Sequence, residues 1–161
     1  MLMEDFRVGF GYDSHRLAAG LKLRLGGVEI EYDRGCVAHS DGDAVIHALC
    51  DALLGAAALG DIGTHFPDSD PAYKGISSTV LLQKTVELLR QEGWKVNNAD
   101  VTIVLERPKL VDYKPLMQAR LADLLGIPAA AMSVKAKSNE GMGFTGRGEG
   151  VAVMAAVTVV K

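Results

Sequence analysis

Side chains of the types that can bind divalent metals lie in two short stretches near the start of the sequence, Asp13–His15 and His39–His47. Asp13 and His15 are two residues apart in an extended segment, so their side chains should project to the same face. His47 lies in an Ala/Leu-rich stretch that predicts a helix, and Asp43 shares its helical face. One carboxylate and two imidazoles could form a three-ligand metal site with an open fourth position. The spacing alone leaves open that His15 is an ordinary surface or hydrogen-bonded histidine.

Two further polar segments could bind a phosphorylated ligand. The segment Lys137–Glu140 offers a cation, a hydroxyl, an amide and a carboxylate in succession, which suits a phosphate with bound Mg²⁺ or simply an exposed strand end. The acidic stretch 61–70 is either a solvated turn or a binding loop. Asp61 follows a predicted helix, where the helix dipole disfavours a carboxylate, and this favours a functional role. The basic turn Arg107–Lys109 is equally compatible with a phosphate contact and with a plain surface turn.

The glycine-rich string Gly141–Gly146 matches GxGxxG but is not a dinucleotide fingerprint. That motif follows a strand and opens a helix, whereas this string precedes a β run near the end of the chain. We interpret it as a tight loop in which backbone approaches backbone or ligand closely.

The elements that must position these residues predict an α+β fold. Strands are expected at residues 6–12, 21–25, 28–30, 101–105, 133–136 and 151–160, helices at 43–59, 77–91 and 115–126, and loops at 61–75 and 141–150. The expected architecture is a two-layer sandwich with helices packed on one face of a mixed sheet. The last strand is apolar on both faces, so a second copy of the chain should cover the face that the helices leave open.

Composition limits the classes of function. With 161 residues, 48% hydrophobic and 23% charged, the chain predicts a single globular domain over residues 1–161. A formal net charge of −3 gives no basic surface for nucleic acid or an anionic membrane, and no apolar run is long enough to span one. Met1–Asp5 shows no targeting pattern, and Cys36 and Cys50 are too few for a disulfide scaffold. We therefore expect a soluble, cytoplasmic protein.

The motifs together resemble one enzyme family. The matching strings are GYDSH at 11–15, AHSDGDAVIHALCDALLGA at 38–56, GDIGxxFPD at 60–68, RPK at 107–109 and ExxGFTGRGEG at 140–150. In this order and spacing they resemble the 2-C-methyl-D-erythritol 2,4-cyclodiphosphate synthase family of the non-mevalonate isoprenoid pathway. The resemblance implies a homotrimer whose sheets pack around a threefold axis, with active sites at the subunit interfaces. It also implies a cyclising lyase that converts 4-diphosphocytidyl-2-C-methyl-D-erythritol 2-phosphate to the cyclodiphosphate and CMP.

The resemblance also implies a role for each matching residue. Zn²⁺, one per subunit, would be held by Asp13, His15 and His47, and Mg²⁺ or Mn²⁺ would sit near Glu140 at the diphosphate. His39 and Ser138 match positions that stabilise the transition state. The implied substrate-binding residues are Ser40, Asp61, Ile62, Gly63, Phe66, Pro67, Asp68, Ser69, Asp70, Leu105, Glu106, Arg107, Pro108, Lys109, Leu110, Val111, Lys137, Asn139, Phe144 and Arg147. Asp43 and Asp51 would support the metal ligands and substrate, and Arg147 and Glu149 would line a threefold channel that holds an isoprenoid diphosphate in some members.

Two other classes of function remain open at the level of sequence. A zinc phosphodiesterase or nucleotidase could use the same metal site with water as the nucleophile. A non-catalytic trimer could bind a nucleotide or an isoprenoid diphosphate and use the metal only for stability.

Overall fold

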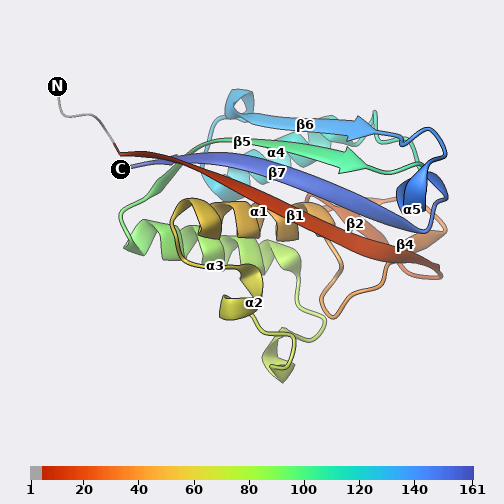
Figure 1. Cartoon of the computed structure of the whole chain (residues 1–161), viewed down its shortest axis with the longest axis horizontal. Coiled ribbons are helices and arrows are strands. Elements are labelled where there is room, and N and C mark those ends of the chain that lie inside the picture. The colour runs from red at the N-terminus through yellow and green to blue at the C-terminus, as the bar shows by residue number, and fades with distance from the viewer. Residues whose placement is uncertain (1–4) are drawn as a thin grey trace.

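Five strands form one mixed sheet that carries the helices on a single face (Figure 1). The computed structural model describes residues 5–161; residues 1–4, on which the expectation about a targeting segment largely rests, lie outside the described residues. In sheet order the strands are β4 (Arg34–Cys36), β1 (Phe6–Ala19), β7 (Gly150–Val160), β5 (Lys95–Val104) and β6 (Met132–Lys137). Neighbours are antiparallel except β5 and β6, which are parallel. A separate hairpin consists of β2 (Leu23–Leu25) and β3 (Val28–Ile30).

Three helices form the second layer, which confirms the expected α+β arrangement of helices and a mixed sheet. They are α1 (Ala44–Ala56), α3 (Ser78–Gln91) and α4 (Lys114–Leu125). The Asp43 carboxylate caps α1 by accepting from the Ile46 N–H, and Gly126 ends α4 in the left-handed conformation that glycine adopts without strain. Within residues 5–161, no helix combines the length and the apolar character needed to cross a membrane.

Some elements differ from the sequence-based expectation. The first strand continues through Asp13 and His15 to Ala19, so both side chains lie within β1 rather than beyond its end. The expected loops contain short helical turns: α2 (Ile62–His65), η1 (Pro71–Tyr73), α5 (Gly143–Gly146) and, elsewhere, η2 (Ala129–Ala131). The sequence analysis missed β4 altogether. It is only three residues long and is defined by pairing with the distant end of β1, which leaves no local signal.

Two glycines on β1 allow α1 to lie directly against the strand backbone. A Cβ atom at Gly9 would lie 1.8 Å from the carbonyl oxygen of Ala52, and one at Gly11 would lie 1.9 Å from that of Ala48. Each step of two residues along β1 thus moves about one turn toward the beginning of α1. Because side chains alternate across a strand, the next residue on this face is Asp13, which meets the first turn of α1 near His47. The close strand–helix contact therefore sets the geometry of the site.

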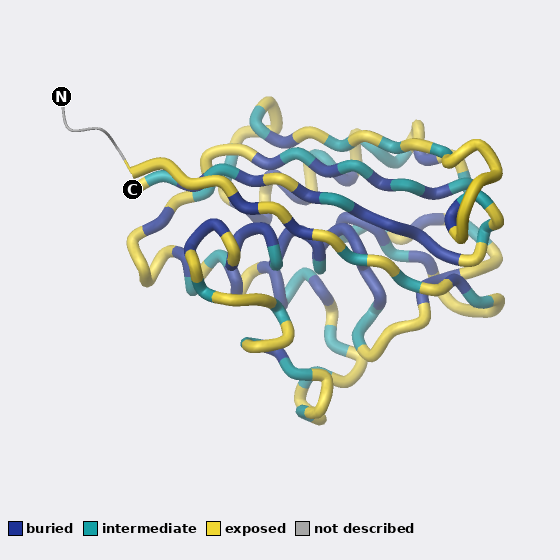
Figure 2. The backbone as a smooth tube through the Cα atoms, viewed as in Figure 1, coloured by how far each residue is buried: buried dark blue, intermediate teal, exposed yellow. Residues whose placement is uncertain are grey.

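The opposite face of the sheet is open, and its β1 side is apolar. On β1 the side chains of Phe6, Val8, Phe10 and Tyr12 are between 51% and 67% exposed. Their neighbours on β7 include Met154 and Ala156. The other face of β7 is fully buried beneath the helices, and Figure 2 shows exposed and buried positions alternating along β1. Exposed apolar surfaces that are contiguous occur at protein–protein, membrane and ligand contacts.

Candidate metal centre and substrate pocket

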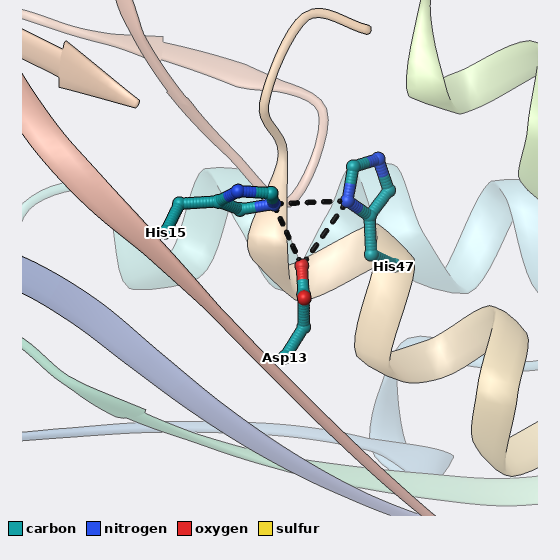
Figure 3. Close-up of side chains that lie close together, drawn as sticks. All are labelled: Asp13, His15 and His47. Atoms are coloured by element: carbon teal, nitrogen blue, oxygen red, sulfur yellow. Dashed lines mark hydrogen bonds and ion pairs between the residues drawn. The ribbon is translucent and has the colours of Figure 1, made fainter. Parts of the chain in front are cut away.

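Asp13, His15 and His47 converge on one point between β1 and the first turn of α1 (Figure 3). The Oδ2 atom of Asp13 lies 2.8 Å from Nε2 of His15 and 3.1 Å from Nδ1 of His47. The same two ring nitrogens are 3.1 Å apart. One carboxylate oxygen and two imidazole nitrogens at these distances match the donor set of a three-ligand metal site. The triad predicted from the sequence is therefore brought together as a candidate metal centre.

The ionisation of the triad follows from its mutual contacts. Burial opposes ionisation of Asp13, but hydrogen bonds and the charges of His15 and His47 outweigh it and hold the pKa of Asp13 at about 2. Burial likewise lowers the pKa of His47, yet the hydrogen bond and charge of Asp13 raise the pKa above its ordinary value of 6.5. Below this raised pKa, the metal-free site holds a proton on His47 that a bound cation must displace.

Metal affinity should consequently fall as the pH falls through the raised pKa of His47. Affinity falls with falling pH because a proton and the cation compete for Nδ1 of the same ring. Because the pKa of His47 is raised, the loss of metal affinity begins above pH 6.5 rather than below it. We would measure Zn²⁺ binding by competition with a chromophoric chelator at a series of pH values. An affinity that stayed constant from alkaline pH down to pH 6.5 would contradict this assignment of the proton.

The metal centre opens into a pocket of about 350 Å³. Loop residues after β4 and around α2 form its walls. Its lining contains these residues singled out in the sequence: Asp13, His15, His39, Ser40, His47, Asp51, Ile62, Gly63, Phe66, Pro67 and Asp68. Most of the residues expected to hold the sugar portion of a substrate are thus gathered beside the metal ligands.

The remaining predicted residues do not line this pocket within the single chain. A second cavity of about 220 Å³ is lined by Leu105, Pro108, Lys109, Leu110, Val111, Lys137 and Ser138. A third, of about 240 Å³, is lined in part by Phe144 and Glu149, and Arg147 donates to Glu149 at 2.8 Å. His39 and Ser138, expected at the same reacting phosphates, therefore belong to different pockets of one chain.

Loop residues outside these cavities have local structural contacts. Asp61 caps α2 by accepting from the Thr64 N–H at 2.9 Å, and Asp70 caps η1 by accepting from the Ala72 N–H at 2.9 Å. Glu106 accepts from the backbone N–H of Asn139 at 3.0 Å. Glu140 has a positive φ of 53°, and Ser69 and Arg107 are exposed. The substrate and metal roles of these residues remain predictions.

The Asp43 carboxylate contacts backbone N–H groups at the start of α1, and its supporting role toward the metal ligands remains a prediction. Its fully buried carboxylate accepts from the N–H groups of Gly26 at 2.8 Å, Gly27 at 2.7 Å and Ile46 at 3.1 Å. The carboxylate thereby joins the β2–β3 turn to the start of α1. It supports the helix that carries His47 and makes no hydrogen bond to the His47 ring. Asp51 accepts from the Ile62 N–H at 2.7 Å and holds α2 at the pocket, where its carboxylate also lines the wall.

Sequence reasoning missed two residues behind the metal centre: Ser78 contacts His47, and Asp41 contacts Ser78. Oγ of Ser78 lies 2.9 Å from Nε2 of His47, on the side of the ring away from Asp13. Asp41 in turn accepts hydrogen bonds from Ser78. No local signal indicates this contact, because His47 lies 31 positions before Ser78 in the sequence.

This combination defines a small α+β protein with a three-ligand metal centre open to a pocket. The chain belongs to the YgbB family, whose sequence model matches residues 6–160, and the resemblance drawn from the motifs is confirmed. A curated relative from Syntrophus aciditrophicus (strain SB), named 2-C-methyl-D-erythritol 2,4-cyclodiphosphate synthase, is 57% identical over 155 residues, covering 96% of this chain and 97% of that protein.

Two solved structures share the fold. One is the bifunctional IspDF from Campylobacter jejuni, with a TM-score of 0.94 and 39% identity; the match covers 98% of this chain but 42% of that longer one. The other is a 2C-methyl-D-erythritol-2,4-cyclodiphosphate synthase in a CDP-bound form, with a TM-score of 0.87 and 40% identity, covering 94% of this chain and 98% of that one.

Proposed function

We propose that the chain converts 4-diphosphocytidyl-2-C-methyl-D-erythritol 2-phosphate to 2-C-methyl-D-erythritol 2,4-cyclodiphosphate and CMP. It would thus act as a cyclising phosphorus–oxygen lyase in the non-mevalonate isoprenoid pathway. The observation that carries the proposal is the convergence of Asp13, His15 and His47 at the mouth of a pocket in a chain of this family. The names of its relatives and the CDP-bound structure support the same reaction.

The donor set fits Zn²⁺, which Asp13, His15 and His47 would hold. When bound, the cation supplies Lewis-acid polarisation of a phosphate oxygen. Glu140, the last residue of the polar segment Lys137–Glu140, is the proposed contact for Mg²⁺ or Mn²⁺ carried by the diphosphate. Both cations reduce the repulsion between the two phosphate groups that must meet.

The protein's main contribution is to fold the substrate. The 2-phosphate attacks the β-phosphorus of the same molecule, an oxygen–phosphorus bond forms, and CMP departs with its bonding electron pair. No general base is needed because a phosphate dianion is already a nucleophile. Walls built from the loop around α2 would hold the methylerythritol in a bent conformation. Such orientation supplies roughly 7–11 kcal/mol in favourable intramolecular reactions.

A complete active site would require more than one copy of the chain. His39 lines the metal pocket, whereas Ser138 lines the cavity beside the 105–111 segment. We propose a homotrimer in which the second cavity of one copy, as a cytidine site, faces the metal pocket of its neighbour. The open apolar face formed by β1 and β7 supplies a surface for the sheets to pack around a threefold axis. The third cavity, near Arg147 and Glu149, would then lie close to that axis.

Placing a charge on the open face should break this assembly. Phe10 is 67% exposed in the single chain and would be buried in the trimer, so Phe10→Asp should shift the mass measured by light scattering from trimer to monomer. Cyclisation should be lost with it. Leu116 on α4 is 56% exposed and lies away from this face, so Leu116→Asp serves as the control that stays trimeric. A trimeric, active Phe10→Asp protein would rule out this face as the interface.

The deciding experiment follows the attacking oxygen. Purified protein with the diphosphocytidyl methylerythritol phosphate, Mg²⁺ and heavy-oxygen water should yield CMP and an unlabelled cyclic diphosphate by mass spectrometry. A labelled linear phosphate would mean that water is the nucleophile. The protein would then be a phosphodiesterase and not a cyclising lyase. A lack of turnover in trimeric, zinc-loaded protein would favour a binding function.

A further inference from the structure

We propose that Asp41 and Ser78 are positioning residues that fix which nitrogen of His47 carries its hydrogen. In this arrangement a chain of hydrogen bonds runs from His47 through Ser78 to Asp41 and leaves Nδ1 of His47 free to bind a cation. The inference rests on the metal role proposed for the triad. It adds the two residues that orient His47, the ligand on α1.

The direction of the chain follows from counting donors at Asp41. Its Oδ2 atom accepts from the backbone N–H of Ser78 at 3.0 Å, and its Oδ1 atom accepts from that of Asp43 at 3.3 Å. The Ser78 hydroxyl contacts the same Oδ1 atom. An ionised carboxylate has no hydrogen to give, so the hydroxyl hydrogen of Ser78 must point at Asp41.

The state of the imidazole follows from the state of the hydroxyl. With its only hydrogen directed at Asp41, Oγ of Ser78 can act toward His47 only as an acceptor. The Nε2 atom, 2.9 Å away, must then carry the ring hydrogen and donate it to Ser78. A neutral ring with hydrogen on Nε2 presents its lone pair at Nδ1, which is the atom that faces Asp13 and His15.

The location of Ser78 makes this restraint rigid. Ser78 is fully buried and is the first residue of α3, so both its backbone and its hydroxyl are anchored by one carboxylate. Ser40 also lies 3.1 Å from Nε2 of His47, but its Oγ is already engaged as an acceptor of the Gly42 N–H at 3.3 Å. Its second acceptor position is open to a hydrogen on Nε2, so Ser40 is compatible with the same orientation. Partners of this kind commonly change metal affinity by about 10–100-fold when removed.

The test compares two adjacent serines. Ser78→Ala removes the acceptor, and we expect Zn²⁺ affinity, measured by chelator competition, to fall about 10–100-fold. Ser77→Ala is the matched control, because Ser77 is exposed and its hydroxyl contacts only Thr79, so its Zn²⁺ affinity should match that of the unchanged protein. Circular dichroism establishes that each variant is folded.

A spectroscopic readout separates positioning of the ring from general support of the fold. In zinc-free protein at a pH where the ring is neutral, long-range ¹H–¹⁵N NMR should find the His47 hydrogen on Nε2, and Ser78→Ala should shift it toward Nδ1, where Oδ2 of Asp13 lies 3.1 Å away and can accept it. If Ser78→Ala does not fold, the same NMR measurement on Asp41→Asn tests the direction of the hydrogen-bond chain. An amide NH₂ facing Ser78 would donate to its hydroxyl, which would then donate to Nε2 and move the ring hydrogen to Nδ1.

Unchanged Zn²⁺ affinity together with an unchanged tautomer in a folded variant would overturn the proposal. These readouts use Zn²⁺ alone, with no substrate. A linear product in the heavy-oxygen experiment would therefore refute the proposed reaction and leave this inference standing. The reverse also holds, because cyclisation does not by itself require the hydrogen-bond chain.

Discussion

A His47→Ala protein should lose the zinc of the triad and lose cyclisation by about a thousandfold or more. The substitution leaves Asp13 and His15 as the two remaining ligands, too few for a stable closed or catalytic zinc site. Polarisation by a bound cation is worth several kcal/mol, and each 1.36 kcal/mol is tenfold in rate. Metal content by mass spectrometry and CMP release under saturating substrate would measure the two losses.

The same variant distinguishes a catalytic from a structural metal. The proposed trimer contact is the far face of the sheet, so His47→Ala should remain trimeric. Dissociation on metal loss would show instead that the metal holds the assembly together. His65→Ala is the matched control for metal content: its ring contacts the carbonyl oxygen of Leu59 at 2.7 Å and takes no part in the triad, so the variant should retain one zinc per chain.

Two of the three candidate metal ligands could be predicted to lie together because they are only two residues apart in sequence. Alternation along a strand places Asp13 and His15 together, and the helical pattern around residue 47 supplies the third ligand on an element that packs on that strand. The ends of the elements also have local sequence signals. Asp43 caps the start of α1, Gly126 ends α4, and a glycine pair joins β2 to β3. Each of these features depends on residues only a few positions apart.

What could not be predicted depends on contacts across the chain. Ser78 reaches His47 only because α3 packs against α1, and β4 exists only because three residues pair with the end of β1. The sequence pattern places Asp43 on the helical face of His47, but it does not show that three backbone N–H groups, two of them from a distant turn, donate to the Asp43 carboxylate. A helical spacing of four shows that two side chains share a face of the helix. It does not show which neighbouring groups each side chain contacts.

The strand–helix contact that builds the site should also be the point at which the fold is most sensitive. Gly11→Ala would place a Cβ atom 1.9 Å from the carbonyl oxygen of Ala48, and neither backbone can yield without moving α1 away from β1. We expect the free energy of unfolding to fall by about 3 kcal/mol or more, at the upper end for overpacking. Because His47 moves with α1 and Asp13 does not, Zn²⁺ affinity should fall in the same variant.

The control makes the same change on the same helix with the opposite expected sign. Gly55 lies within α1 on its exposed side, and a Cβ atom there would meet nothing within 4 Å. Gly55→Ala should therefore stabilise the protein by about 0.5–1 kcal/mol, since alanine loses less backbone entropy in a helix, and should leave Zn²⁺ binding unchanged. Urea unfolding at one fixed protein concentration would measure both variants. Equal effects of the two substitutions would mean that glycine at position 11 is not required for the close approach of α1, and the metal site would then owe its geometry to other contacts.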